Sequence, residues 1–106
     1  MPVKEIEEMR DRLAEGLMPQ RIYLFGSYAN GTYNEDSDFD FYIVVNDDAD
    51  NLADLTAKAY TAIGNDRQRS VDILVGRSTR FEKMKLLPTV ENEVYRKGVL
   101  LYGRAD

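Results

Sequence analysis

Apolar residues recur along the chain with two spacings, one typical of helices and one typical of strands. Over 3–17 they keep a helical spacing with charged residues between them, and Pro19 ends the segment. A second helical pattern runs to Ile63 after a cap at Asp50 or Asn51. Both segments are predicted to be amphipathic helices that turn an apolar side toward the core.

Shorter helical segments are predicted at three further places. One begins with a cap at Ser78 or Thr79 and turns three apolar residues inward, namely Phe81, Met84 and Leu87. Another has Pro88 in its first turn and stops at Gly98, since proline suits the start of a helix and glycine its end. A brief helical turn is expected at 27–31, because serine is a favoured cap.

Strands are predicted at 21–25, 38–45 and 71–75, and the tail at 99–102 suits an edge strand. Side chains alternate between the two faces of a strand. Along the second strand, alternation gives one face of Phe39, Phe41, Ile43 and Val45 and an opposite face of Asp38, Asp40, Tyr42 and Val44. The two aspartates are therefore expected to point in the same direction.

Alternating helices and strands, in the order α-β-α-β-α-β-α, predict an α+β fold with a small mixed β-sheet and helices packed on it. The 106 residues suffice for one core, so we expect a single domain over 1–106. A small domain with a one-sided sheet leaves open that it pairs with itself, as a homo-oligomer, or with a partner.

Composition excludes several kinds of chemistry. The chain has no cysteine and no histidine, which excludes disulfides, thiolate metal sites and Ser-His or Cys-His nucleophiles. It has no apolar run of membrane-spanning length and no pattern typical of a secretory signal, so the cytoplasm is the expected location. A site here must use carboxylates, hydroxyls, amides, Lys and Arg.

Negative charge is concentrated in one stretch. The chain has 19 acidic and 14 basic residues and a net charge of −5. Seven of the acidic residues, and no Lys or Arg, fall within 34–50. The other 12 acidic residues are spread over the rest of the chain with all 14 basic ones. An acidic protein is a poor candidate for binding bare DNA or RNA, so no direct nucleic-acid binding is expected.

The paired aspartates indicate a metal site. Asp38 and Asp40 on one face of a strand repel each other and lose hydration, which a strand tolerates poorly unless a cation lies between them. Hard oxygen ligands favour magnesium or manganese. Asp72 lies mid-strand among Val, Ile and Leu, where a carboxylate is costly without a partner. It either holds a second metal ion, accepts a proton from an attacking hydroxyl, or pairs with Arg69 at the surface.

Gly26 and Ser27 follow the first strand and suit a phosphate. The missing side chain at Gly26 lets the backbone approach a ligand closely. The next amides, together with the Ser27 hydroxyl, are able to donate hydrogen bonds to phosphate oxygens.

Gly26-Ser27, ten intervening residues and then Asp38-Phe39-Asp40 match a known signature, Gly-Ser-x10-Asp-x-Asp. In this the chain resembles the DNA polymerase β-like nucleotidyltransferase superfamily, and most of all its minimal branch, the MNT-domain proteins. The resemblance covers nearly the whole chain, including the segments 71–74 and 95–102. It implies a polymerase β-like nucleotidyltransferase core.

The resemblance also implies a reaction. Mg²⁺-ATP binds with its triphosphate on Gly26 and Ser27, and Asp38, Asp40 and Asp72 serve as catalytic and metal-holding residues for what are expected to be two ions. Asp72 helps to activate an acceptor hydroxyl, which attacks the α-phosphate while pyrophosphate leaves. In MNT proteins the acceptor is a tyrosine of a partner HEPN-domain toxin, so the implied function is a protein adenylyltransferase antitoxin.

One position departs from the family pattern. The residue after Ala29 is often arginine in relatives, and here it is Asn30, so a phosphate or partner contact is lost or supplied elsewhere. Arg67, Arg69 and Arg77 lie near Asp72 in sequence, and the sequence does not say which of them reaches the site.

Other functions and roles stay open at this stage. The chain is alternatively a non-catalytic antitoxin that only binds its partner, or a nucleotidyltransferase for small molecules such as aminoglycosides. About a hundred residues leave little room for the added domain that holds a small acceptor. Four tyrosines near the motif, of which one is a candidate to stack on adenine, are expected mainly to pack in strands and loops: Tyr23, Tyr28, Tyr33 and Tyr42.

Overall fold

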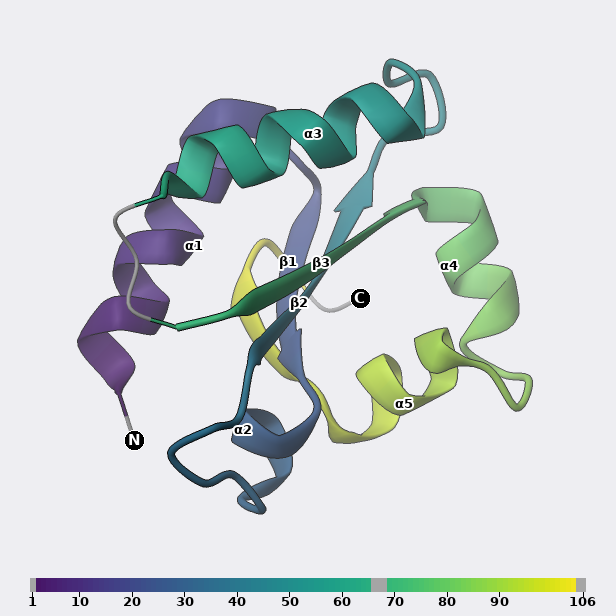
Figure 1. Cartoon of the computed structure of the whole chain (residues 1–106). Coiled ribbons are helices and arrows are strands. Elements are labelled where there is room, and N and C mark those ends of the chain that lie inside the picture. Colours follow the sequence, from purple (N-terminus) through teal and green to yellow (C-terminus); the bar gives the residue numbers. More distant parts are fainter. Residues whose placement is uncertain (1, 66–68, 105–106) are drawn as a thin grey trace.

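In the computed structural model, which describes residues 2–65 and 69–104, four strands form one mixed sheet in the order β3-β2-β1-β4 (Figure 1). The central strand β1 (Arg21–Phe25) pairs antiparallel with β2 (Phe39–Val45) and with β4 (Val99–Tyr102). At the other edge, β3 (Val71–Arg77) runs parallel to β2. The parallel pair is possible because α3 crosses from the end of β2 back to the start of β3.

Helices cover both faces of this sheet. On one face, α1 (Val3–Leu17) packs beside α3 (Leu52–Ile63), and on the other lie α4 (Ser78–Met84) and α5 (Val90–Lys97) (Figure 1). The short α2 (Ser27–Asn30) is one turn that follows β1. The expectation of a one-sided sheet is therefore wrong, because the second face carries its own apolar side chains.

Two apolar clusters hold the layers together. The larger lies between the sheet and α1 and α3, and it takes alternate residues of β2, namely Phe39, Phe41, Ile43 and Val45. The smaller lies between the sheet and α4 and α5 and is formed by Tyr23, Phe25, Tyr42, Val44, Phe81 and Val94. Each fully buried side chain of this size contributes about 1.5–3 kcal/mol to folding. The predicted alternation along β2 is thus confirmed.

Polar contacts fix the smaller cluster in place. Arg21 is buried at the start of β1 and donates a hydrogen bond of 2.8 Å to Glu82 on α4. The buried carboxylate of Glu91, in the first turn of α5, accepts one of 2.8 Å from the hydroxyl of Tyr42. These bonds tie both helices to the sheet, and each satisfies a polar group that would be costly to bury alone.

Most predicted elements are confirmed with their bounds shifted by a residue or two. The helix at 3–17, the strand at 21–25 and the cap at Asn51 are found as predicted. The second strand begins at Phe39, so Asp38 lies just before it. The predicted α+β fold, a small mixed sheet with helices packed on it, is confirmed.

The predicted starts of the last two helices are wrong. The N-cap of α4 is Arg77, and the carboxylate of Asp47 accepts hydrogen bonds from both the amide and the hydroxyl of Thr79. The first residue of α5 is Val90, because Thr89 caps it by accepting a hydrogen bond from the amide of Asn92.

Pro88 therefore lies outside α5, and Leu87, predicted to face inward, is 47% exposed. Among the described residues, no helix has both the length and the apolar character needed to span a bilayer.

Candidate active site

Three predicted site residues meet at one end of the face that carries α4 and α5. Asp40 on β2 and Asp72 on β3 are register partners in the parallel pair, and Phe25 on β1 is the partner of Asp40 on the other side. Neighbouring strands lie about 4.8 Å apart, so these side chains stand next to one another on one face. Asp38 precedes Asp40 by two residues at the mouth of β2. The strand pairing thus brings together the aspartates that the sequence singled out.

Gly26 lies directly beside Asp40, in the row of aspartates that Asp38, Asp40 and Asp72 form. Its backbone has φ 73°, in the region that favours glycine, and a Cβ atom at this position would overlap Oδ2 of Asp40. The carbonyl of Gly26 accepts the amides of Ala29 and Asn30, each at 3.1 Å, which turns the chain sharply into α2. Any other residue here would push Asp40 aside, so the glycine is required by both its conformation and its neighbour.

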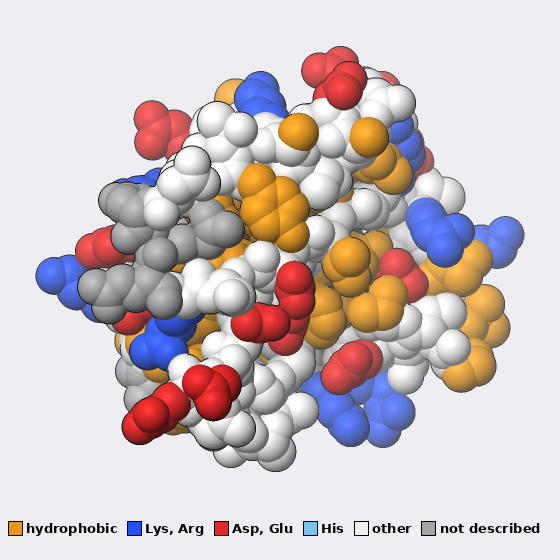
Figure 2. All heavy atoms as spheres, viewed as in Figure 1, with side chains coloured by type: hydrophobic (Ala, Val, Ile, Leu, Met, Phe, Trp, Pro, Cys, Tyr) orange, Lys and Arg blue, Asp and Glu red, His pale blue; other side chains and the backbone are white. Residues whose placement is uncertain are grey.

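The pKa of Asp40 shows how crowded this row is with negative charge. Partial burial, as the largest cause, together with the charges of Asp72, Asp38 and Glu93, raises it from an ordinary value of 3.8 to about 6. Figure 2, which looks at the β3 edge of the sheet, shows acidic side chains near the centre of the view, in front of the strands. Glu93 comes from α5 and was missed in the sequence, because only the docking of α5 brings it near.

A divalent cation fits this arrangement. Within 2–65 and 69–104, the carboxylates of Asp38, Asp40 and Asp72 form no ion pair and accept no hydrogen bond. In the same ranges no three Asp, Glu, His or Cys side chains lie close enough together to hold one ion alone. Magnesium is commonly held by one or two carboxylates and completed by water and phosphate oxygens, so the aspartates suit ions shared with a nucleotide.

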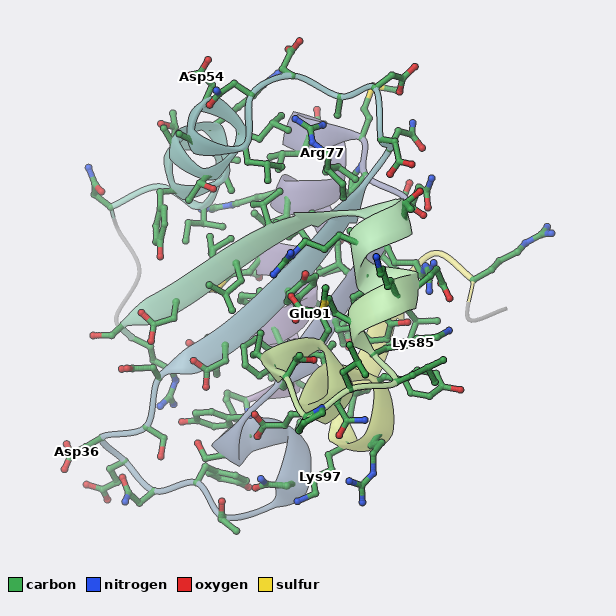
Figure 3. All side chains as sticks on the ribbon, turned by 90° about the vertical axis from the view of Figure 1, so that its right-hand side faces the viewer. Asp36, Asp54, Arg77, Lys85, Glu91 and Lys97 are labelled. Atoms are coloured by element: carbon green, nitrogen blue, oxygen red, sulfur yellow. The ribbon has the colours of Figure 1, made fainter. Side chains whose placement is uncertain are left out.

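Arg69 and Arg77, which are near Asp72 in sequence, bind other groups and do not pair with the aspartate row. Arg69 donates 2.8 Å to the hydroxyl of Tyr28 and pairs with Glu5 at 3.3 Å, so the alternative of an Asp72–Arg69 surface pair is wrong. Arg77 donates to backbone carbonyls of the 47–50 loop, and Figure 3 shows it at the opposite end of the view from Lys97. Arg67 lies outside the described residues.

The tyrosines around the motif mainly pack, as expected. Tyr23 stacks on Phe81 with ring centroids 5.5 Å apart, and Tyr28 stacks on Tyr33 at 4.5 Å. Tyr42 is buried below the aspartate row, and its hydroxyl lies so close to β3 that a Cβ on Gly76 would overlap it. Tyr23 and Tyr42 thus pack on the same face of the sheet as the aspartates, whereas Tyr28 packs on the opposite face.

Comparison with known proteins places this geometry in a family. The model of the nucleotidyltransferase domain family matches residues 4–101. The protein adenylyltransferase MntA of Shewanella oneidensis is 38% identical over 65 residues, which is 59% of this chain and 45% of that protein. The matched part is therefore less than half the length of this relative.

Two solved structures share the fold. A chain in a crystal structure of a toxin-antitoxin with AMP-PNP is 28% identical with a TM-score of 0.58, and the match covers 92% of this chain and 73% of that one. The spectinomycin adenyltransferase of Enterococcus faecialis has a TM-score of 0.69 at 16% identity, over 98% of this chain and 57% of that one. The second likeness shows the fold alone.

The family model spans nearly all of the chain, from the first turns of α1 to β4, and it includes the Gly26 turn and the aspartate row. This chain belongs to the nucleotidyltransferase domain family.

Proposed function

We propose that the chain is a Mg²⁺-dependent nucleotidyltransferase that transfers AMP from ATP to a tyrosine of a HEPN-domain toxin, and so acts as the antitoxin. The observation that carries the proposal is the row of Asp40 and Asp72 in register beside Gly26, with Asp38 at its mouth and no cation paired with them among the described residues. The relative named protein adenylyltransferase supports the reaction. The toxin-antitoxin structure with AMP-PNP, an ATP analogue, supports the nucleotide and the kind of partner.

The residues divide the tasks in this proposal, and Asp72 has two of them, as a metal ligand and as the general base. Asp38, Asp40 and Asp72 hold the Mg²⁺ ions, for which two are expected. When bound, these ions neutralise the phosphate charge and align the attacking and leaving oxygens. Gly26 leaves room for the nucleotide beside Asp40, and the hydroxyl and amide of Ser27 donate hydrogen bonds to phosphate oxygens.

The transfer step balances without a further reactant. The tyrosine oxygen of the acceptor bonds to the α-phosphorus of ATP, and the bond from that phosphorus to the bridging oxygen breaks. Asp72 takes the phenolic proton as general base, and the pyrophosphate leaves with the bond's electrons. Asp72 is exposed at the edge strand β3, so an acceptor on another protein is able to reach it.

The test uses the purified chain, a HEPN-domain protein encoded beside it, Mg²⁺ and ATP labelled at the α-phosphate. We expect the label to appear on the partner, with one pyrophosphate released for each AMP transferred. The double change Asp38→Asn and Asp40→Asn abolishes this transfer, while Asp48→Asn, a matched change at an exposed loop carboxylate, leaves it intact.

Two results would overturn the proposal. If wild type and the double variant neutralise the toxin equally and no label moves, the chain is a binding antitoxin without chemistry. If the label appears only on an aminoglycoside supplied as acceptor, the small-molecule alternative is correct.

A further inference from the structure

A nucleotide triphosphate brings several negative charges to a site that is itself acidic. The aspartate row accounts for the cations but leaves the outer phosphates without a positively charged side chain. We infer that Arg96 and Lys97, at the end of α5, bind the β- and γ-phosphates of the nucleotide; this inference rests on the function proposed above.

The pairing of β4 with β1 places these two residues beside the Gly26 turn. Val99 is the register partner of Leu24, so the chain just before β4 lies next to the end of β1. Gly98 packs there so closely that a Cβ on it would lie 3.2 Å from the carbonyl oxygen of Leu24. Lys97 precedes Gly98 and Gly26 follows Phe25, so the end of α5 and the turn lie at the same end of the sheet.

The figures agree with this placement. In Figure 2 a group of basic side chains lies at the lower end of α5, close to the acidic side chains near the centre of the view. In Figure 3 the side chain of Lys97 extends at the end of the molecule where α2 lies. Positive and negative side chains thus stand side by side on one open face, as an Mg²⁺-triphosphate requires.

Both side chains line a hollow, and neither has a hydrogen-bond or ion-pair partner in the part of the chain that the structure describes. A pocket of about 440 Å³ along α5 is bordered by Thr89, Asn92, Glu93, Arg96 and Lys97, with Pro88 and Val90 at its start. Arg96 and Lys97 are exposed, and neither forms an ion pair or hydrogen bond within residues 2–65 and 69–104.

Three other cations described on this side of the sheet are engaged, whereas Arg80 and Lys83 on α4 form no side-chain hydrogen bond or ion pair with the described residues. Arg21 and Lys85 both pair with Glu82, and Arg77 is held by backbone carbonyls. The basic pair on α5 is therefore free to receive an anion.

The residue after Ala29 explains why such a contact is needed. Asn30 carries no charge, and its side-chain oxygen already accepts hydrogen bonds from the amide and the hydroxyl of Thr32, at 3.3 and 2.7 Å. It therefore supplies no cation to a phosphate, whereas the end of α5 supplies two. Glu93 borders the same pocket and opposes a phosphate, so binding through this pair depends on Mg²⁺.

The test measures binding rather than turnover. Isothermal titration of Mg²⁺-ATP and of AMP is carried out on wild type, on the double change Arg96→Gln with Lys97→Gln, and on a matched control that removes two positive charges elsewhere, Lys58→Gln with Arg104→Gln. Both control residues are exposed, and Lys58 lies on α3, across the sheet. Thermal unfolding by circular dichroism checks that each variant is folded.

We expect the Arg96 and Lys97 double change to raise the Kd for Mg²⁺-ATP about 10- to 100-fold, the range for loss of charge-assisted hydrogen bonds. The Kd for AMP, which has no β- or γ-phosphate, stays within about twofold. The reverse swap, Arg96→Lys with Lys97→Arg, keeps most of the affinity. If the double variant does not fold, the single changes Arg96→Gln and Lys97→Gln replace it.

Three outcomes distinguish a failure of the inference about Arg96 and Lys97 from a failure of the proposed function. If wild type binds Mg²⁺-ATP and the double variant binds it equally, the inference is overturned and the proposed function stands. The two basic residues then act only by interacting favourably with the negative end of the α5 dipole. If the control weakens binding as much, the effect is one of net charge and the inference is again overturned. If wild type binds no Mg²⁺-nucleotide at all, both the function and the inference fail.

Discussion

Asp40 and Phe41 are neighbours on β2, yet they face opposite sides of the sheet and do opposite things for the protein. Phe41 is fully buried in the cluster under α1 and α3, where only apolar groups surround it. Asp40 faces the side of α4 and α5, where partial burial and then the charges of nearby carboxylates raise its pKa to about 6. One face of the strand stabilises the fold, and the end of the other face holds charges that weaken it.

The second face is itself divided along the strand. From Tyr42 onward it is apolar and covered by Phe81 of α4 and Val94 of α5, whereas its first residue, Asp40, lies beyond their cover. The fold tolerates the charged row because the packed apolar region begins at Tyr42, two residues after Asp40. Stability and chemistry are therefore expected to respond to different substitutions on the same strand.

The largest expected effect is on the apolar face. Phe41→Ala removes a fully buried ring and leaves a cavity, which lowers the free energy of unfolding by about 3–5 kcal/mol. Urea denaturation followed by circular dichroism measures this loss. The matched control is Leu74→Ala on β3, which is 42% exposed and is expected to cost about 1 kcal/mol or less. A loss below about 1 kcal/mol for Phe41→Ala would mean that this face does not hold the fold.

On the charged face, a substitution should lower activity and leave stability unchanged or higher. Asp40→Asn is expected to lower the proposed AMP transfer by about 100-fold or more, because it removes a proposed metal ligand. Its melting temperature without metal stays the same or rises, since the change relieves repulsion from Asp38 and Asp72. Labelled-ATP transfer and a thermal melt on one preparation measure both quantities. A clearly lower melting temperature of Asp40→Asn in the absence of metal would contradict the prediction that the charged row weakens the fold.

The sequence predicted the elements that local pattern decides. The spacing of apolar residues indicated α1 and β1 with their observed bounds, and period-two alternation put Asp40 and Phe41 on opposite faces. The role of Asp72 in the same site as Asp40 was implied by the family resemblance, and the pairing of their strands was not predicted, since no local pattern says which strands are neighbours. The structure shows that the register of β2 and β3 makes Asp40 and Asp72 direct partners.

Contacts between distant parts of the chain were not predictable in this way. Asp47 accepts hydrogen bonds from Thr79 in the first turn of α4, 32 positions away, and Glu91 accepts one from Tyr42 across 49 positions. Glu93 affects Asp40 only because α5 docks on the second face of the sheet, a face that the sequence left uncovered. Such residues look like ordinary surface charges of a short helix until the tertiary fold is known.

The bond that docks α5 gives a third, smaller effect. Tyr42→Phe removes the donor to Glu91 and leaves a buried carboxylate without that hydrogen bond, which is expected to cost about 1–3 kcal/mol. Burial and the nearby Glu91 keep the pKa of Tyr42 above its ordinary value, so the hydroxyl remains a donor at working pH. The matched control is Tyr95→Phe, an exposed tyrosine on the same helix. Equal stability of Tyr42→Phe and wild type in urea would show that α5 is held without this bond.

The smallest effect is one of pH, and its sign follows from the raised pKa of Asp40. Below about pH 4 this carboxyl is protonated in both folded and unfolded chains, so it has no influence on stability. Between about pH 4 and 6 the unfolded chain releases the proton while the folded chain retains it, so the metal-free protein loses stability as pH rises. Above about 6 both forms are ionised and the loss stays constant.

The difference in melting temperature between Asp40→Asn and wild type isolates this group from all others that titrate. Measured without metal, it should be near zero at pH 4, grow in favour of the variant up to pH 6, and reach only a few degrees because Asp40 is partly open to solvent. Adding Mg²⁺ at pH 7 should stabilise wild type alone, since a bound cation offsets the repulsion that the variant lacks. A difference that is flat with pH, or a Mg²⁺ effect of equal size in both proteins, would place the destabilising charge somewhere other than the aspartate row.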